Sequence, residues 1–487
     1  MDNTATTGRD AAWRRELRDA MSARERTAIP RATMPMLDPA YRITCNEEVN
    51  QGLSAEQAVL EATRCLDCPD PQCVTGCPVG IDIPGFVKNI QRGDATTASA
   101  VLRRTSALPA VCGRVCPQEK QCESRCIYNK MKKAPVAIGW LERYAADTAR
   151  SLPRPADTGS AAPNGIRVAV AGSGPAGLSF AGDMARRGFN VTVFEALHEI
   201  GGVLKYGIPE FRLPNSVVEY EIDGLRQMGV EFHTDTVIGK TLSYDDLLAD
   251  GFRGIFVASG AGLPRFMGIP GENYINILSS NEYLTRINLM HAGTPGYATP
   301  VPRGARVAVI GGGNTAMDSV RTALRMGASE AMLIYRRTRA EMPARAEEIA
   351  HALEEGVRLI ELANPVEYLA DERGHVRAMR IQRMELGEPA PDGRRSPVPI
   401  PGAIDEIEVD VVVVSVGVSP NPLIPNSIDG LDVTQRGTIA VDDRLHSSLG
   451  PLYAGGDIVR GGATVILAMG DGRSAAASMA ERLLAEA

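Results

Sequence analysis

Cysteine is confined to one short part of this chain, because nine cysteines lie between Cys45 and Cys126 and none follows. Residues Met1 to Tyr41 contain no apolar stretch of the kind that directs secretion. A disulfide framework is therefore not expected in so large a chain. The longest apolar run, Val409–Val418, is too short to span a bilayer and is typical of a buried parallel strand. We expect a cytoplasmic protein with no membrane partner.

Positive charge is not in excess either. The net charge of −7 at pH 7 gives no reason to expect a nucleic acid as partner. The apolar fraction of 44% and the charged fraction of 23% are ordinary for a globular protein. At 487 residues, the chain is long enough for several domains, each with its own core. The function therefore has to be inferred from motifs rather than from composition.

A glycine-rich turn between two apolar segments organises the middle of the sequence. The segment Val168–Ala171 leads into Gly172-Ser-Gly174-Pro-Ala-Gly177, and a second apolar segment ends at Glu195. Gly172 permits a sharp turn, Gly174 lets the backbone approach a pyrophosphate, and Gly177 lets a helix pack on the strand. The phosphates would bind at the helix N-terminus, and Glu195 would accept hydrogen bonds from a ribose. The pattern predicts a dinucleotide site; the alternative is a tight turn without a ligand.

A second fingerprint, with the spacing G-x-G-x-x-A, follows the apolar segment 307–310. After the next apolar segment it has arginines where the first fingerprint has a glutamate. An acidic side chain there repels a ribose 2′-phosphate, whereas an arginine binds it. We therefore expect NADPH rather than NADH; the alternative is that the arginines form a solvated strand end. The residues predicted to bind NADPH are Gly311, Gly313, Asn314, Thr315, Ala316, Arg336 and Arg337.

Two further segments are typical of a flavin site. Gly455-Gly456-Asp457 precedes a helical segment that starts after Thr464. The glycines would let a ribityl chain lie close, Asp457 would accept its hydroxyls, and the helix N-terminus would stabilise the reduced ring. The Gly- and Pro-rich segment Gly201–Pro209 is suited to a loop around a bound ring system. The residues predicted to bind FAD are Gly172, Gly174, Gly177, Glu195, Gly202, Gly456, Asp457 and Thr464.

No cysteine accompanies either nucleotide motif. A disulfide reductase needs a cysteine pair beside its flavin, so that class is excluded. The six histidines are scattered, and no catalytic dyad or nucleophile elbow is apparent. Hydride transfer from a nicotinamide to a flavin depends on alignment more than on acid–base groups. We therefore predict no catalytic side chain.

Eight of the nine cysteines form two groups, with the spacings C-x2-C-x4-C-x3-C-P and C-x3-C-P-x4-C-x3-C. Thiolates suit iron–sulfur clusters, and a C-x3-C-P ending resembles two-cluster ferredoxins, where the last cysteine of a run ligates the other cluster. This logic predicts two 4Fe–4S clusters. One would be bound by Cys65, Cys68, Cys73 and Cys126, and the other by Cys77, Cys112, Cys116 and Cys122.

Alternatives remain for these cysteines. Structural zinc usually takes two C-x2-C-type pairs, and only Cys65 and Cys68 have that spacing, so zinc is the weaker alternative. Glu142, on an expected helix, offers an oxygen ligand in place of Cys112. Cys45 stands apart and is expected to be a buried small side chain rather than a ligand.

The order of these motifs predicts an α/β fold. An N-terminal helical two-cluster iron–sulfur domain would precede two Rossmann-like dinucleotide-binding domains with glutathione-reductase-like topology. A proline- and glycine-rich stretch would link the two parts. The expected boundaries are 1–150 for the cluster domain, 151–165 for the linker, 166–290 and 420–487 for the FAD domain, and 291–419 for the inserted NADPH domain.

Two other segments are interpreted by pattern alone. Trp13, Leu17 and Met21 recur at helical spacing, which predicts a helix that packs either on its own domain or on a partner subunit. Inside the NADPH domain, Glu385–Pro401 is rich in proline and glycine, so we expect a turn-rich excursion there.

Taken with these motifs, the chain resembles the small (beta) subunits of bacterial NADPH-dependent glutamate synthase. The similarity takes in both cysteine groups, both glycine loops, Tyr335-Arg-Arg with Glu341-Met-Pro-Ala344, and Gly455-Gly-Asp457. The same module resembles the electron-input half of dihydropyrimidine dehydrogenase and of related NADPH:ferredoxin and sulfide dehydrogenases. In the dihydropyrimidine enzyme a side-chain oxygen ligates one cluster, and Glu142 is the matching position here.

The resemblance implies a function as an electron-input subunit. NADPH would be oxidised via FAD, and electrons would pass through the two clusters to FMN on a large (alpha) subunit that makes L-glutamate from L-glutamine and 2-oxoglutarate. We find neither an N-terminal nucleophilic cysteine nor an FMN barrel, so we expect a hetero-oligomer with that large subunit. The rivals are a related NADPH:ferredoxin or sulfide oxidoreductase, a subunit of a pyrimidine-reducing complex and, outside enzymes, a zinc-containing redox-sensing scaffold.

Overall fold

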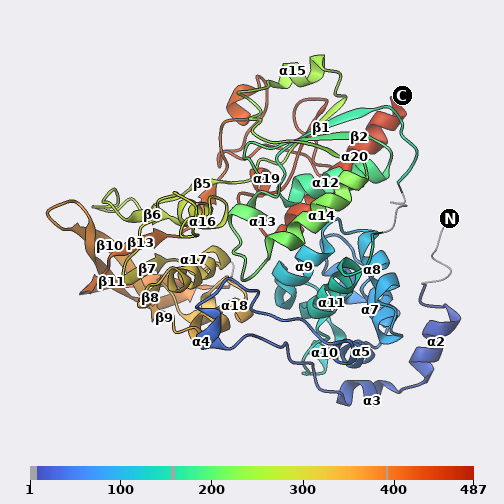
Figure 1. Cartoon of the computed structure of the whole chain (residues 1–487), viewed down its shortest axis with the longest axis horizontal. Coiled ribbons are helices and arrows are strands. Elements are labelled where there is room, and N and C mark those ends of the chain that lie inside the picture. Colours follow the sequence, from blue (N-terminus) through green and yellow to red (C-terminus); the bar gives the residue numbers. More distant parts are fainter. Residues whose placement is uncertain (1–7, 155–159, 391–392, 487) are drawn as a thin grey trace.

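The computed structural model describes residues 8–154, 160–390 and 393–486. A bundle of short helices from the N-terminal third packs beside two α/β units, each built on its own parallel sheet (Figure 1). The expected linker 151–165 includes residues 155–159, which lie outside the described residues.

The N-terminal part consists of short helices whose first turns are capped by nearby side chains. Ser54 closes a capping box with Gln57, and Asp82 and Asp94 accept backbone N–H groups of the helices that they precede. The helices are α2 (Ala12–Asp19), α3 (Ala23–Ala28), α4 (Pro39–Arg42), α5 (Ala55–Thr63), α6 (Gln72–Thr75), α7 (Ile83–Gln91), α8 (Ala95–Arg103), α9 (Pro109–Val115), η1 (Gln118–Lys120), η2 (Glu123–Arg125), α10 (Ile127–Lys130) and α11 (Ile138–Arg150).

The first sheet has the strand order β15-β4-β1-β2-β3, and all its pairs are parallel. Strands of one direction end at one edge, so the segments after β1, β2 and β15 meet there; these carry Gly172, Glu195 and Gly456. The elements are β1 (Arg167–Ala171), α12 (Pro175–Arg186), β2 (Asn190–Phe194), α13 (Val203–Tyr206), α14 (Asn215–Gln227), β3 (Glu231–His233), α15 (Tyr244–Ala249), β4 (Gly254–Val257), η4 (Pro425–Ser427), β15 (Leu452–Ala454), α19 (Asp457–Arg460) and α20 (Val465–Ala485).

The second sheet has the order β6-β13-β7-β8-β9 and is also parallel throughout. Its elements are β6 (Ile277–Ser279), α16 (Ser280–Asn288), β7 (Arg306–Ile310), α17 (Asn314–Arg325), β8 (Glu330–Tyr335), η3 (Arg339–Glu341), α18 (Ala346–Glu354), β9 (Arg358–Glu361) and β13 (Val411–Val414). A separate antiparallel sheet contains β10 (Ala363–Ala370), β11 (Val376–Pro389) and β12 (Arg395–Glu408), and β5 (Leu263–Pro264) pairs with β14 (Val418–Ser419).

Two segments lie elsewhere than the sequence indicates. The strand β6 pairs with β13 of the second sheet, so we propose that the boundary expected at residue 290 lies before β6. The segment Glu385–Pro401, expected to be turns, contributes to the two long paired strands β11 and β12. Pro397 and Pro399 are tolerated because β12 is an edge strand, where a missing backbone donor leaves no ladder partner unsatisfied.

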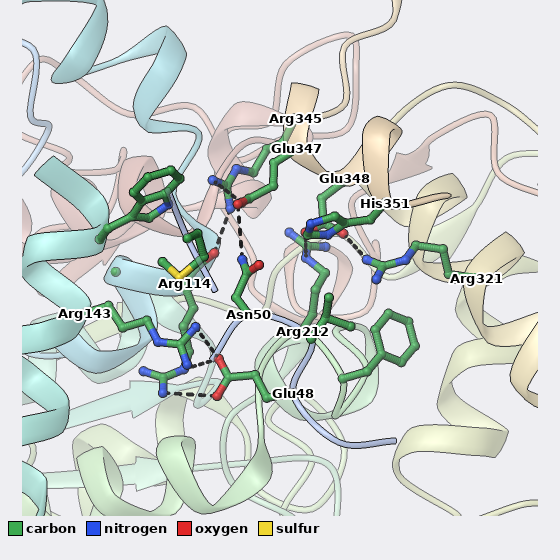
Figure 2. Close-up of a pocket in the computed structure, with 15 residues that line it drawn as sticks. Glu48, Asn50, Arg114, Arg143, Arg212, Arg321, Arg345, Glu347, Glu348 and His351 are labelled. Carbon is green, nitrogen blue, oxygen red and sulfur yellow. Dashed lines mark hydrogen bonds and ion pairs between the residues drawn. The ribbon is translucent and has the colours of Figure 1, made fainter. Parts of the chain in front are cut away.

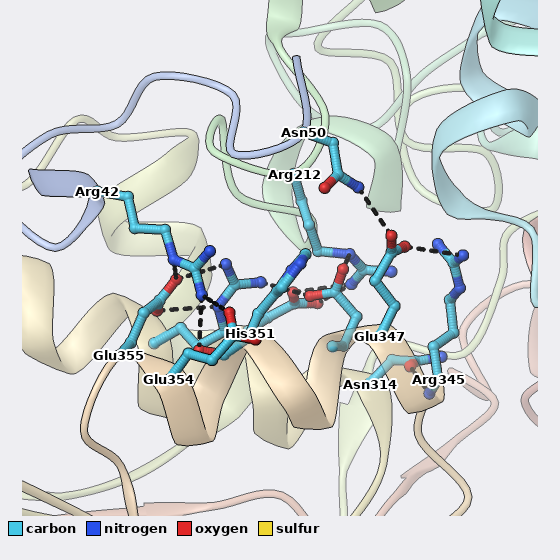
Figure 3. A network of polar contacts seen from close by, with 12 residues as sticks. Arg42, Asn50, Arg212, Asn314, Arg345, Glu347, His351, Glu354 and Glu355 are labelled. Carbon is cyan, nitrogen blue, oxygen red and sulfur yellow. Dashed lines mark hydrogen bonds and ion pairs between the residues drawn. The ribbon is translucent and has the colours of Figure 1, made fainter. Parts of the chain in front are cut away.

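Buried charges join the second α/β unit to the rest of the molecule. The N-terminal segment reaches across to α18, where Arg42 donates to Glu354 at 2.6 Å and Glu355 at 2.9 Å (Figure 3). From the first α/β unit, Arg212 donates to both oxygens of Asp318 on α17 at 2.8 Å. These pairs connect three segments that are far apart in the sequence.

The helical bundle meets the same junction at Arg345. Its guanidinium donates to the carbonyl of Arg114 at 2.7 Å and to the side chain of Gln118 at 2.9 Å. Figure 2 shows the small polar pocket at this junction, where Arg114 and Arg143 from the bundle both face Glu48 of the N-terminal segment. The relative position of the units therefore depends on paired buried charges.

Arg321 lies at the centre of the charges on the second unit and is fully buried. It donates to Glu348 at 2.5 Å and to Glu355 at 2.7 Å. Burial alone would raise the pKa of Glu348, but Arg212 and Arg321 lower it to about 2. The ion pairs therefore stabilise the protein above the ordinary glutamate pKa of about 4.5, and this stabilisation is lost as the pH falls from there toward 2.

We predict that Arg321→Ala destabilises the second unit by about 3–5 kcal/mol, because it removes the buried cation that Glu348 and Glu355 share and leaves each carboxylate only partly compensated. The matched control is Arg358→Ala, which removes an exposed arginine paired with Glu330 and should cost at most about 1 kcal/mol. Urea denaturation followed by far-UV circular dichroism measures the free energy of unfolding of both variants. Equal losses for the two variants would contradict the role given to the buried network.

Candidate redox site

The first glycine turn is as tight as its sequence predicts. Gly172 has φ +109°, and a Cβ there would lie 2.5 Å from the carbonyl oxygen of Ala258. A Cβ on Gly177 would lie 2.0 Å from the carbonyl oxygen of Gly172, so the helix packs on the strand through bare backbone. A Cβ on Gly174, by contrast, would meet no atom within 4 Å. The backbone at Gly174 therefore faces open space of the kind that a pyrophosphate needs.

Glu195 is buried at the end of β2 and is held by three donors. Its carboxylate accepts the N–H of Ser173 at 2.9 Å, the hydroxyl of Ser173 at 2.5 Å and the N–H of Leu197 at 2.9 Å. Ser173 had no sequence signal of its own, because it occupies a variable position between two motif glycines. These contacts fix Glu195 beside the glycine turn.

The Gly-Gly-Asp segment lies directly against the first fingerprint. A Cβ on Gly456 would lie 2.9 Å from the Cβ of Ala176, at the start of α12. Burial raises the pKa of Asp457, whose carboxylate accepts the N–H of Ala463 at 2.9 Å. Thr464 accepts the N–H of Leu467 at 3.3 Å and so caps α20.

Two more contacts complete this edge. A Cβ on Gly202 would lie 2.9 Å from the Cα of Gly174, so the loop expected around a ring system lies on the phosphate turn. Asp471 accepts the N–H of Gly456 at 2.9 Å and pairs with Arg460 at 2.6 Å. Sequence reasoning missed Asp471, because an aspartate inside a long helix carries no motif. The eight residues predicted to bind FAD thus lie on turns, on caps or in the first turn of a helix, in the segments that follow β1, β2 and β15.

The second fingerprint repeats the geometry at the other sheet. A Cβ on Gly311 would clash with the carbonyl oxygen of Ser415, whereas a Cβ on Gly313 would meet no atom within 4 Å. At the start of α17, the side-chain oxygen of Asn314 accepts the N–H of Arg345 at 2.9 Å. The next two residues, Thr315 and Ala316, are exposed and buried respectively.

Arg336 and Arg337 follow β8, which pairs with β7, so they lie at the same edge as the second glycine turn. Arg336 is exposed. Arg337 is half-buried and donates to the carbonyl of Arg395 at 2.7 Å. The structure thus brings all seven residues predicted to bind NADPH to one edge of the second sheet.

Four thiols line a cavity in the helical bundle. The cavity has a volume of about 310 Å³, and its other walls are largely apolar, with prolines, isoleucines and valines. Burial raises the pKa of the Cys68, Cys73 and Cys126 thiols, so metal binding there would release protons. We name these thiols the outer set: Cys65, Cys68, Cys73 and Cys126.

The other four thiols, Cys77, Cys112, Cys116 and Cys122, form the inner set. Their electrostatic neighbours include one another and Glu142, and burial is a cause of the raised pKa of each. Burial, then Glu221, raises the pKa of Glu142 to about 8, and one of its carboxylate oxygens has no hydrogen-bond partner. Cys112 and Glu142 are therefore both near this set, and both interpretations of the remaining ligand stay predictions. Cys45 lies apart, half-buried, with its thiol 3.9 Å from the carbonyl of Arg42.

The C-terminal helix α20 connects the edge predicted to bind flavin to the inner set. The Sδ atom of Met469 lies 3.5 Å from the Sγ atom of Cys112. The carbonyl of Met469 accepts the hydroxyl of Ser179 on α12 at 2.9 Å, and Gly470 lies against Pro78. Thr464, which is predicted to bind FAD, caps the same helix. It is therefore about 7.5 Å along the helix axis from Met469, the residue that contacts Cys112.

Comparison with known proteins identifies the family. Residues 42–153 match the model described as dihydropyrimidine dehydrogenase domain II, 4Fe–4S cluster, and residues 166–472 match that of the pyridine nucleotide-disulphide oxidoreductases. The glutamate synthase (NADPH) small chain of Azospirillum brasilense is 37% identical over 442 residues, which cover 88% of this chain and 90% of that one. The chain belongs to the family of glutamate synthase small chains and related oxidoreductases.

Other members of this family carry different names. The beta subunit of the NADP⁺-dependent formate dehydrogenase of Moorella thermoacetica is 38% identical over 436 residues, covering 84% of this chain and 60% of that one. Among solved structures, FprA of Mycobacterium tuberculosis in complex with NADPH has a TM-score of 0.55 at 20% identity, covering 66% of this chain and 85% of that one. That likeness bears on the fold alone.

These matches confirm the expected fold class, a helical iron–sulfur domain followed by Rossmann-like FAD- and NAD(P)-binding domains. The chain is an NAD(P)H-dependent flavin and iron–sulfur oxidoreductase subunit of this family. In the described part of the chain, no helix has both the length and the apolar character needed to cross a membrane.

We predict opposite outcomes for two alanine substitutions in the first glycine turn. Gly174→Ala meets open space, so the apoprotein should keep its stability within about 0.5 kcal/mol while FAD affinity falls. Gly177→Ala places a Cβ 2.0 Å from backbone oxygen, so it should destabilise the apoprotein itself. Thermal unfolding of flavin-free protein and flavin content after purification measure the two effects. Unchanged flavin content in Gly174→Ala would contradict the proposed phosphate position.

Proposed function

We propose that this protein is the electron-input (small) subunit of a glutamate synthase. The observation that carries the proposal is the contact of α20 with both redox regions, since a single helix caps the predicted flavin site and reaches Cys112. The choice of glutamate synthase within the family is supported by alignments that take in about nine-tenths of two such small chains, compared with 60% of the formate dehydrogenase subunit.

The residues at the two sheet edges fit two nucleotides. Gly174 and the N-terminus of α12 would hold the FAD pyrophosphate, Glu195 the ribose, and Asp457 the ribityl hydroxyls. The N-terminus of α20 would orient the flavin pyrimidine. When bound, the cofactors supply hydride transfer and one-electron chemistry, and the side chains here bind, orient and exclude water.

Two thiol sets suggest two 4Fe–4S clusters rather than one. The outer set surrounds a cavity, and within the described ranges no three His, Cys, Asp or Glu side chains are arranged to hold one metal ion. Thiols placed around a cavity suit a cluster better than a zinc ion, whose sulfur ligands lie about 2.3 Å from the metal. The apolar walls and the free state of all eight thiols fit cluster binding as well.

The outer set is the more exposed of the two, since three of the four inner thiols are buried and all four outer thiols are half-buried. We therefore place electron entry at the inner set, beside α20, and electron exit at the outer set. A large subunit that receives these electrons would dock near the outer cavity. An NADPH-linked oxidoreductase with a different electron acceptor would pass electrons through the same FAD and clusters. The identity of the partner protein therefore decides between these functions.

We predict that Arg336 and Arg337 determine the preference for NADPH. Replacing both with glutamine removes charge-assisted hydrogen bonds to the 2′-phosphate, each worth about 1.5–3 kcal/mol, so KM for NADPH should rise at least about tenfold. KM for NADH should change little, because NADH lacks that phosphate. Steady-state reduction of ferricyanide measures both, with the exposed Arg358→Gln on the same sheet as control. A parallel rise for both nucleotides would contradict the assignment.

The partner is tested by tagged purification of the full chain from its native host. We expect a large subunit to co-purify and the complex to oxidise NADPH only when L-glutamine and 2-oxoglutarate are both present. Iron and acid-labile sulfide should accompany FAD in the purified chain. Oxidation of NADPH by the complex without these two substrates, or zinc in place of iron, would reject the proposal.

A further inference from the structure

Three arginines of the N-terminal segment converge on one residue of the outer set's first loop. Asp67 lies between Cys65 and Cys68, is fully buried and has a φ of +51°. Its carboxylate accepts Arg14 at 2.6 and 3.1 Å and Arg18 at 2.6 Å. Its backbone carbonyl accepts the side chain of Arg9 at 3.0 Å. The segment with the helical stripe thus packs on its own domain, at the loop that carries two predicted ligands.

A further buried cation lies on the other side of this loop. The ammonium of Lys88 on α7 is buried and donates to the carbonyl of Cys65 at 2.5 Å. Arg26, on α3, lies close enough to interact electrostatically with Cys65 and Lys88. The inner set differs, because the carboxylate of Glu142 acts electrostatically on all four of its thiols, while Glu123 acts on one thiol of each set, Cys122 and Cys126. The buried cations thus lie beside the outer set, and the carboxylate common to all four thiols lies beside the inner set.

We propose that the N-terminal segment 9–26 is a redox-tuning element that raises the reduction potential of the cluster in the outer set. The inference rests on the proposed cluster binding and deepens it. Reduction adds one negative charge to a cluster, so a nearby uncompensated carboxylate disfavours it and nearby cations favour it. Arg14 and Arg18 neutralise Asp67, and Arg26 and Lys88 add positive charge. The higher reduction potential of the outer cluster favours electron transfer from the inner set to the outer set.

The test uses two substitutions with opposite expected signs. Asp67→Asn removes the buried carboxylate but leaves its arginines, so the midpoint potential of the outer cluster should rise. Arg14→Gln leaves Asp67 partly uncompensated, so that potential should fall. We expect at least a tenfold change in the reduction equilibrium for each, which corresponds to about 59 mV for a one-electron couple. Redox titration of the purified holoprotein, followed by electron paramagnetic resonance, measures both.

Controls separate tuning from simple support of the loop. Arg15, on the same helix, is exposed and donates to the carbonyl of Asp10, so Arg15→Gln should leave both potentials unchanged. If Arg14→Gln fails to assemble its cluster, Arg18→Gln, at a side chain 17% exposed, should give a smaller fall in the same direction. Unchanged potentials in Asp67→Asn and the arginine variants, with both signals intact, would overturn the tuning role. A wild-type chain without iron and sulfide would instead overturn the proposed function.

Discussion

The packing of α20 against bare backbone is the constraint on which the redox arrangement depends. A Cβ on Gly472 would lie 2.2 Å from the carbonyl oxygen of Ala176, so this helix and α12 approach more closely than side chains would allow. The same helix lies 3.5 Å from Cys112 through Met469. If α20 lay farther out by the width of one side chain, its contacts with α12 and with Cys112 would both be lost. The edge predicted to bind flavin and the inner thiols are therefore both positioned by α20.

The second α/β unit is held differently, by charge rather than by close backbone packing. Arg42 and Arg212 reach its helices from two other parts of the chain (Figure 3). Arg321 and Arg345 belong to the unit itself and pair with Glu348 and Glu347 of α18. Buried ion pairs contribute modest net stability, because desolvation offsets most of their attraction, yet a mismatched arrangement is strongly unfavourable. Such contacts suit the selection of one relative orientation. In a hydride-transferring protein that orientation decides whether the nicotinamide meets the flavin.

Charge also distinguishes the two thiol sets, although their spacings in the sequence are similar. Arginines of α2 pair with Asp67 in the loop of the outer set and Lys88 donates to the carbonyl of Cys65, whereas the carboxylate of Glu142 acts on all four inner thiols. None of these charges is part of a cysteine motif. The Cys65–Cys68 loop carries Asp67, which on its own would be an unfavourable neighbour for a reduced cluster, and the N-terminal segment compensates it.

The sequence by itself determined the local parts, because glycine turns, strand ends and cysteine spacings are set within about thirty residues. Gly172, Gly311 and Gly456 lie where their motifs predict, at carboxyl edges of parallel sheets. Only the tertiary structure decided what depends on partners distant in the chain. The pairing of β6 with β13, the edge strand at Pro397, the contact of Asp67 with Arg14 and the meeting of Met469 with Cys112 all join segments without a common motif. Their residues carry no periodic signal, so the contacts become visible only when the chain is folded.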